Sequence, residues 1–122
     1  MEKTIFIYYY PFELETFSPI SEKDIESVAR CTLHIPREHR LVKELFSIFE
    51  KVEAGEFDSR VVRMKIKSPR SVISYVDQDG GLKSVVKSGT SDAKLTAEGF
   101  RLLKVWAGQA IEKFNGCSSS EN

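Results

Sequence analysis

RVVRMKIKSPRSVISYVDQDGGLKSVVKS, residues 60–88, contains three strand patterns separated by two breaks. Apolar and basic side chains alternate in the first pattern, and this period of two predicts a strand with one face on a core and the other in water. The apolar residues are Val62, Met64 and Ile66, and the basic residues are Arg63, Lys65 and Lys67. Ser68-Pro69 forms the first break. Asp79-Gly80 forms the second and is typical of a tight hairpin turn, because glycine accepts a positive φ.

The flanking sequence predicts an α+β domain. Residues 3–10, rich in β-branched and aromatic side chains, predict a first strand, and residues 12–17 a short second extended piece. Amphipathic patterns predict helices from the N-cap Ser21 to Pro36, over 37–54, and over 97–115 after the N-cap Thr96. Residues 89–94 are predicted as a loop. We therefore expect a mainly antiparallel sheet of four to five strands, with three helices packed on one side and the order β(β)ααβββα.

The length of 122 residues fits one domain, predicted over residues 1–116, followed by a flexible polar tail over 117–122. Cys31 and Cys117 are too few for a disulfide framework, so we expect both to be reduced and the protein to be cytoplasmic. The first residues do not resemble a signal peptide, and no segment is predicted to span a membrane.

Charge is balanced overall but uneven along the chain. Residues 1–30 carry six acids and three bases (net −3), whereas residues 61–90 carry six bases and two acids (net +4). Two interpretations stay open: the regions face each other in the fold, or one of them is a recognition surface. The zero net charge argues against a bulk nucleic-acid or membrane-surface binder.

No pattern indicates a metal, a cofactor or catalysis. Cys31, His34, Glu38 and His39 lack the second ligand pair of a zinc site. Residues 77–80 begin like a calcium loop, but the position of its final glutamate is Ser88, so we interpret Asp77 and Asp79 as carboxylates of a tight turn. Without a nucleophile motif or a phosphate-binding glycine loop, we expect no enzyme and no cofactor.

Two surfaces are candidates for macromolecular binding. Acids and aromatic side chains gather near the first strand and at the hairpin tip, and such a mixture favours a basic protein partner. Its candidate contact residues are Tyr8, Tyr10, Glu13, Glu15, Asp77 and Asp79. The alternative is a nucleic-acid face formed by Arg63, Lys65, Lys67 and Arg70. If residues 63–67 form an edge strand, a partner could also add a strand there.

The segment VDQDGGLKSVVKSGTSDAKLTAEGFRLLKVW, residues 76–106, resembles the hairpin, loop and Leu-Thr-x-Glu helix endings of small bacterial immunity proteins. These proteins neutralise secreted toxins, including those of contact-dependent growth inhibition. The resemblance implies a non-catalytic cytoplasmic protein that binds a cognate toxin domain, for example a basic nuclease, and occludes it. It assigns no binding residue and no oligomeric state.

Overall fold

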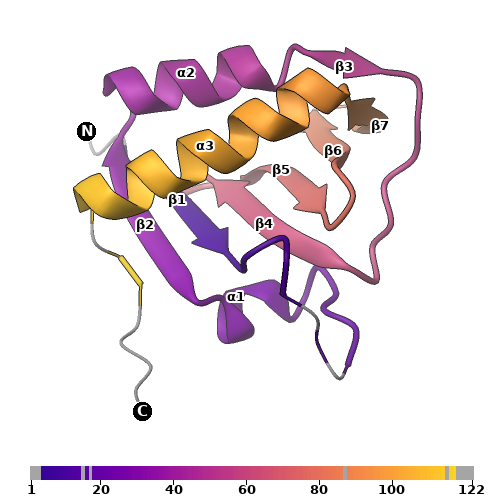
Figure 1. Ribbon diagram of the computed structural model, residues 1–122, viewed down its shortest axis with the longest axis horizontal. Coiled ribbons are helices and arrows are strands. Elements are labelled where there is room, and N and C mark those ends of the chain that lie inside the picture. Colours follow the sequence, from indigo (N-terminus) through magenta and orange to yellow (C-terminus); the bar gives the residue numbers. More distant parts are fainter. Residues whose placement is uncertain (1–3, 15, 17, 87, 115, 118–122) are drawn as a thin grey trace.

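The computed structural model describes residues 4–14, 16, 18–86, 88–114 and 116–117. Within them the chain forms one antiparallel sheet and three helices (Figure 1). The elements are β1 (Thr4–Tyr9), α1 (Ile25–Val28), β2 (Cys31–Pro36), α2 (Arg40–Ile48), β3 (Val52–Glu53), β4 (Val62–Lys67), β5 (Val72–Asp77), β6 (Gly81–Val86), β7 (Gly89–Leu95) and α3 (Ala97–Phe114).

The sheet has seven strands in the order β2-β1-β4-β5-β6-β7-β3. The prediction of an α+β fold with a mainly antiparallel sheet is confirmed, but the prediction of four to five strands is wrong. The three predicted strands of residues 60–88 are present as β4, β5 and β6. The additional strands are β2 and β3, which lie in segments predicted as helices, and β7, which replaces a predicted loop. The described part of residues 12–17 adds no strand.

β2 forms where a helix was predicted because two apolar periods overlap in residues 25–35. Ala29 leaves the helical region with φ −56° and ψ 136°, so α1 ends after one turn. From Cys31 onward buried side chains alternate with more exposed ones, and the strand pairs with β1 from Tyr9↔Cys31 to Thr4↔Pro36. β1 lies between β2 and β4 in the sheet. Its pairing with β2 satisfies the backbone groups on one side of β1, which a helix over residues 31–36 would leave unpaired.

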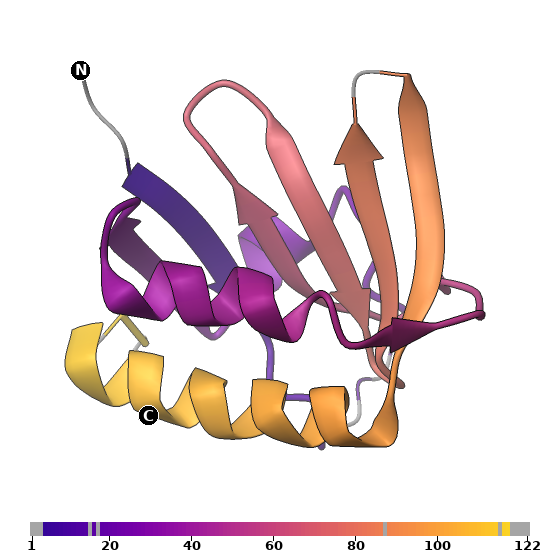
Figure 2. The ribbon, with the colours of Figure 1, turned by 90° about the horizontal axis from the view of Figure 1, so that it is seen from above.

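The two sheet faces are covered differently. Figure 2 shows α2 and α3 side by side across one face, with α1 on the other side. The main core lies under α2 and α3 and includes Ile7, Leu45 and Leu103, each fully buried. Trp106 joins the two helices, because its Nε1 donates a hydrogen bond to the Leu41 carbonyl oxygen at 2.8 Å. The prediction that all three helices pack on one side is therefore wrong.

A β-bulge changes which way the first residues of β4 face. The pairing with β5 shifts register between Val62 and Met64. Met64 and Ile66 lie in the main core, whereas Val62 belongs to a second cluster with Ile20, Ile25 and Tyr75. Arg63, expected on a solvated face, is only 1% exposed. A bulge re-aims side chains in this way, and the predicted strict alternation fails at this point.

Cys31 and Cys117 form a disulfide across 86 residues of sequence, so the prediction of two reduced cysteines is wrong. The Thr32 amide also donates to the Gly116 carbonyl oxygen at 2.9 Å. Cys117, which we expected in the tail, is thus attached to the first residue of β2. Residues 118–122 of the predicted tail lie outside the described part of the chain.

Candidate functional site: the loop end of the sheet

Three irregular segments, residues 10–20, 54–61 and 78–80, lie at one end of the sheet, which we call the loop end (Figure 1). The strand register places them there. β1 and β5 finish where β4 begins, with the pairs Tyr9↔Met64 and Val62↔Asp77. Residues 15 and 17 of the first segment are outside the described part. The loop end contains most of the predicted contact residues.

Two predicted acidic contacts, Glu13 and Asp79, come to this end from distant parts of the sequence, and both are exposed. Phe12 makes an edge-to-face contact with Phe100, with ring centroids 5.0 Å apart. Phe100 in turn packs against Gly80, where an added Cβ would lie 3.3 Å from the ring. These contacts place Glu13 and Asp79, the sequence neighbours of Phe12 and Gly80, at the same end of the sheet. Glu15, the third predicted contact, is outside the described residues.

Asp77 has a structural role instead of the predicted contact role. The residue is 3% exposed, and its carboxylate accepts backbone hydrogen bonds from Asp58, Asp79 and Gly81, each 2.8 Å long. A carboxylate with several backbone donors fixes a turn strongly, because each bond is charge-assisted. The interpretation of Asp77 as a tight-turn carboxylate is confirmed, and Gly80 supplies the positive φ of 94°.

The predicted aromatic anchors are already engaged within the protein. Tyr8 and Tyr10 are half-buried and pack against the second cluster. The guanidinium carbons of Arg30 and Arg63 each lie 5.4 Å from the centroid of the Tyr10 ring. Such contacts hold the Tyr10 ring in place. Tyr10 is therefore a fixed part of the loop end.

The lysines of the basic region form ion pairs with glutamates of the acidic region. Lys65 and Lys67 both pair with Glu26, at 2.6 and 3.4 Å, and Lys83 pairs with Glu22 at 2.7 Å. Hydrogen bonding from Lys65 lowers the pKa of the Glu26 carboxyl. These pairs confirm the interpretation that the acidic and basic regions face each other.

The two arginines of the predicted nucleic-acid face do not extend it, and its strand is not at an edge of the sheet. Arg63 is buried. Arg70 is exposed, but it lies on the turn between β4 and β5 and not on the strand that carries the other three basic residues. β4 is flanked by β1 and β5, so strand addition at residues 63–67 is excluded. The predicted cationic strip is therefore not a continuous free surface.

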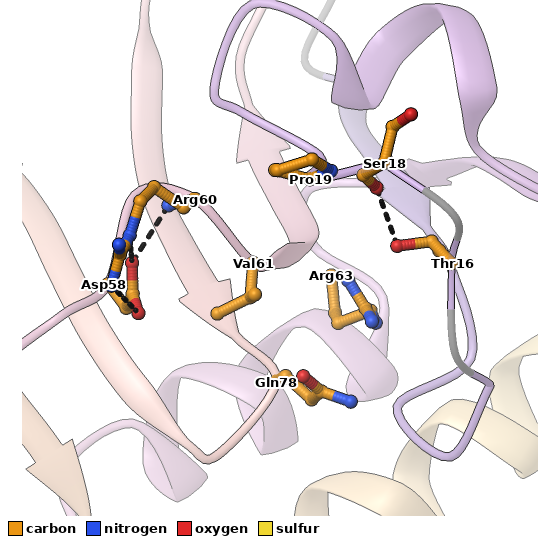
Figure 3. A pocket seen from close by; sticks show the side chains of 8 residues that line it. All are labelled: Thr16, Ser18, Pro19, Asp58, Arg60, Val61, Arg63 and Gln78. Atoms are coloured by element: carbon orange, nitrogen blue, oxygen red, sulfur yellow. Dashed lines mark hydrogen bonds and ion pairs between the residues drawn. The ribbon is translucent and has the colours of Figure 1, made fainter.

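The loop end carries two adjoining hollows that share the ion-paired residues Asp58 and Arg60. One, of about 480 Å³, lies between Thr16, Ser18 and Pro19 on one side and the start of β4 on the other (Figure 3). The other, of about 700 Å³, which we call the acidic hollow, is lined by four acids and two bases. The acids are Glu56, Asp58, Asp77 and Asp79, and the bases are Arg60 and Lys94. Arg60 bonds Asp58 through its side chain and its backbone amide, and these bonds lower the pKa of the Asp58 carboxyl.

The histidines and cysteines do not converge on a metal. Cys31 is in the disulfide, His34 stacks edge-on against Phe6, and His39 caps α2 by accepting the Leu41 amide through Nδ1 at 3.0 Å. Within the described ranges, no group of three His, Cys, Asp or Glu side chains is arranged to hold a metal ion. None of the helices in that part of the chain combines the length and apolarity needed to cross a membrane.

Sequence reasoning missed two functional features of the loop end: the buried position of Arg63 and the participation of Glu56. The signal for the first was present, because Val61 and Val62 are consecutive apolar residues that interrupt the alternation and favour a bulge. Nothing in the local sequence marks Glu56, which comes to the hairpin tip through the Asp58–Asp77 hydrogen bond. Comparison with known proteins gave no matching family model, no matching curated protein and no matching solved structure.

Proposed function

We propose that this chain is a non-catalytic protein-binding module that uses the loop end to bind a basic partner domain. The observation that carries the proposal is that Glu13 and Asp79, both exposed, lie at the same end of the sheet although they are far apart in the sequence. Carboxylates on one surface steer a cationic partner toward it and fix its orientation.

The acidic hollow gives this surface its shape. Glu56 and Asp79 line it as exposed carboxylates, and Lys94 adds one exposed cation. Asp58 is paired with Arg60, and the buried Asp77 accepts three backbone amides. Two exposed carboxylates thus stand on a frame fixed by hydrogen bonds. A preformed frame lowers the entropy lost on association, which favours tight binding.

The partner class rests on the resemblance to immunity proteins. A toxin domain that binds nucleic acid presents lysine and arginine where phosphates dock, and the loop end is complementary to such a surface. Binding there would occlude the toxin's active site without any chemistry by this chain. The cytoplasmic location is also part of this proposal. The cysteines no longer support it, because Cys31 and Cys117 form a disulfide and disulfides persist mainly in oxidising compartments.

The test is capture of the partner with matched charge reversals. The tagged full-length chain is used to recover a stoichiometric basic protein from its source cells, and the affinity for that purified protein is then measured by calorimetry. The double variant Glu13→Lys/Asp79→Lys is expected to weaken binding at least about a hundredfold, because each reversal replaces an attraction with a repulsion.

Glu112→Lys is the matched control, since Glu112 is exposed on α3 far along the helix from Phe100. It should leave affinity within about twofold. All variants change exposed residues, so their melting temperatures should match the wild type. Equal affinity of the double variant and the control would reject the loop end as the binding surface.

A further inference from the structure

Arg63 is a buried cation that the protein leaves incompletely paired. Its side chain is 1% exposed, yet among the described residues it has no carboxylate partner. Nη2 donates to the Leu14 carbonyl oxygen at 3.1 Å and Nη1 to the Val62 carbonyl oxygen at 3.3 Å. Its Nε is buried and has no hydrogen-bond partner within the described part of the chain.

Such an arrangement is costly for a purely structural arginine. Taking a charge out of water is compensated only when an opposite charge and further hydrogen bonds satisfy it. Two neutral carbonyl oxygens and the face of Tyr10 satisfy part of the guanidinium. An unsatisfied buried polar atom in a native site indicates strain, a bound water or a bound ligand.

The position of Arg63 favours a ligand. Figure 3 shows its side chain and that of Gln78 facing the 480 Å³ hollow from different segments. Arg60 lines it further along, and Pro19 and Val61 give it an apolar part. The volume is in the range of small-molecule sites. Among the described residues that line the hollow, the only acid is Asp58, and it is paired with Arg60.

We propose that this hollow is an oxyanion site that takes one phosphate or carboxylate group of a small ligand. The anion lies against the guanidinium of Arg63 and accepts a hydrogen bond from the Gln78 amide, and the rest of the ligand rests on Pro19 and Val61. Arginine suits this role, because its planar fork of donors matches phosphate and carboxylate geometry. The hollow shares Asp58 and Arg60 with the neighbouring acidic hollow, so its anion binding is measured on the chain without a partner.

The experiment uses the full chain and two probes, inorganic phosphate and acetate, each titrated against sodium chloride at matched ionic strength. Affinity is followed by thermal shift and by the nitrogen-15 resonance of the Arg63 Nε–H, assigned with Arg63→Met. We expect a saturable rise in melting temperature with at least one probe and a saturable shift of that resonance. Tighter binding of phosphate identifies a phosphate ligand, and tighter binding of acetate a carboxylate ligand.

Variants separate a ligand site from a structural arginine. Arg63→Met should abolish the anion-dependent stabilisation, whereas Arg70→Met, which removes an exposed arginine outside the hollow, should keep it. Gln78→Leu leaves Arg63 in place and should weaken anion binding about five- to tenfold, so the test stands if Arg63→Met does not fold. The proposal is wrong if neither anion stabilises the chain beyond chloride, or if Gln78→Leu and Arg70→Met respond alike.

Discussion

The two ends of the sheet are built in different ways. At the end opposite the loop end, β4 and β5 are joined by the turn Ser68–Ser71, closed by the Ser68 amide on the Ser71 carbonyl oxygen at 2.8 Å. At the loop end, β1 is followed by residues 10–24 before α1, and β3 by residues 54–61 before β4. Irregular chain is concentrated at one end, where binding residues are generally found.

The contacts that hold the two ends differ in their range along the sequence. The Ser68–Ser71 turn is satisfied within four residues. At the loop end, Asp77 bonds the amide of Asp58, and Arg63 reaches the Leu14 carbonyl oxygen across 49 residues. Long irregular segments are thereby fixed by a few buried polar groups. Removing such a group should therefore destabilise the chain more than removing a polar group of the opposite turn.

The largest effect is expected from the disulfide, which attaches the chain after α3 to the loop-end start of β2. Cys117→Ser should lower the free energy of unfolding by about 3–4 kcal/mol, because the bond closes a long loop in the unfolded chain. Urea denaturation of the wild type, with and without reductant, provides the measurement. If reduction leaves the midpoint of the wild type in place, the bond contributes no stability.

A smaller effect is expected from Asp77→Ala. The substitution leaves three backbone amides without their acceptor and should cost about 2–3 kcal/mol. Ser68→Ala at the opposite turn is the matched control and should cost less than about 1 kcal/mol. Urea midpoints at constant slope give both values. Similar losses at the two turns would remove the distinction between the ends.

The smallest effect is expected from Glu26→Gln, which disconnects α1 from Lys65 and Lys67 over the open sheet face. Because the Glu26 carboxylate is 37% exposed, solvent screening limits the loss to about 0.5 kcal/mol at neutral pH. The folded state lowers the pKa of Glu26 from 4.5, so its contribution is complete above pH 4.5 and is lost as the pH falls below it.

Unfolding free energies of wild type and Glu26→Gln, measured from pH 7 downward, test this sign. The two curves should converge in acid, since a protonated glutamate resembles glutamine. Curves that diverge as the pH falls would contradict the assigned ion pair.

Local patterns sufficed for the elements that are local in sequence. The Asp79-Gly80 turn, the three strands around it and the Thr96 cap, whose hydroxyl accepts the Gly99 amide at 3.0 Å, all follow from short-range rules. β2 was misread because Leu33 fits both the predicted helical stripe that starts at Ile25 and an alternating strand that starts at Cys31. Only the pairing with β1 decides between them, and that partner lies far away in the sequence.

The candidate site was predictable in kind but not in detail. Exposed acids at the hairpin tip and after the first strand were expected, and Glu13 and Asp79 both lie exposed at the loop end. Which acid is buried depends on tertiary hydrogen bonds, as Asp77 and its amide donors illustrate. The hollow beside Arg63 depends on a bulge that turns a surface strand position inward.

The most direct test of the account is amide hydrogen exchange on the free chain and on the chain bound to its captured partner. We predict slower exchange in residues 10–14 and 78–80 of the loop end on binding. The turn 68–71 and residues 88–90, where β7 begins, lie at the opposite end and should keep their exchange rates. Protection confined to residues 68–71 and 88–90, with residues 10–14 and 78–80 unchanged, would contradict the assignment of the loop end as the binding surface.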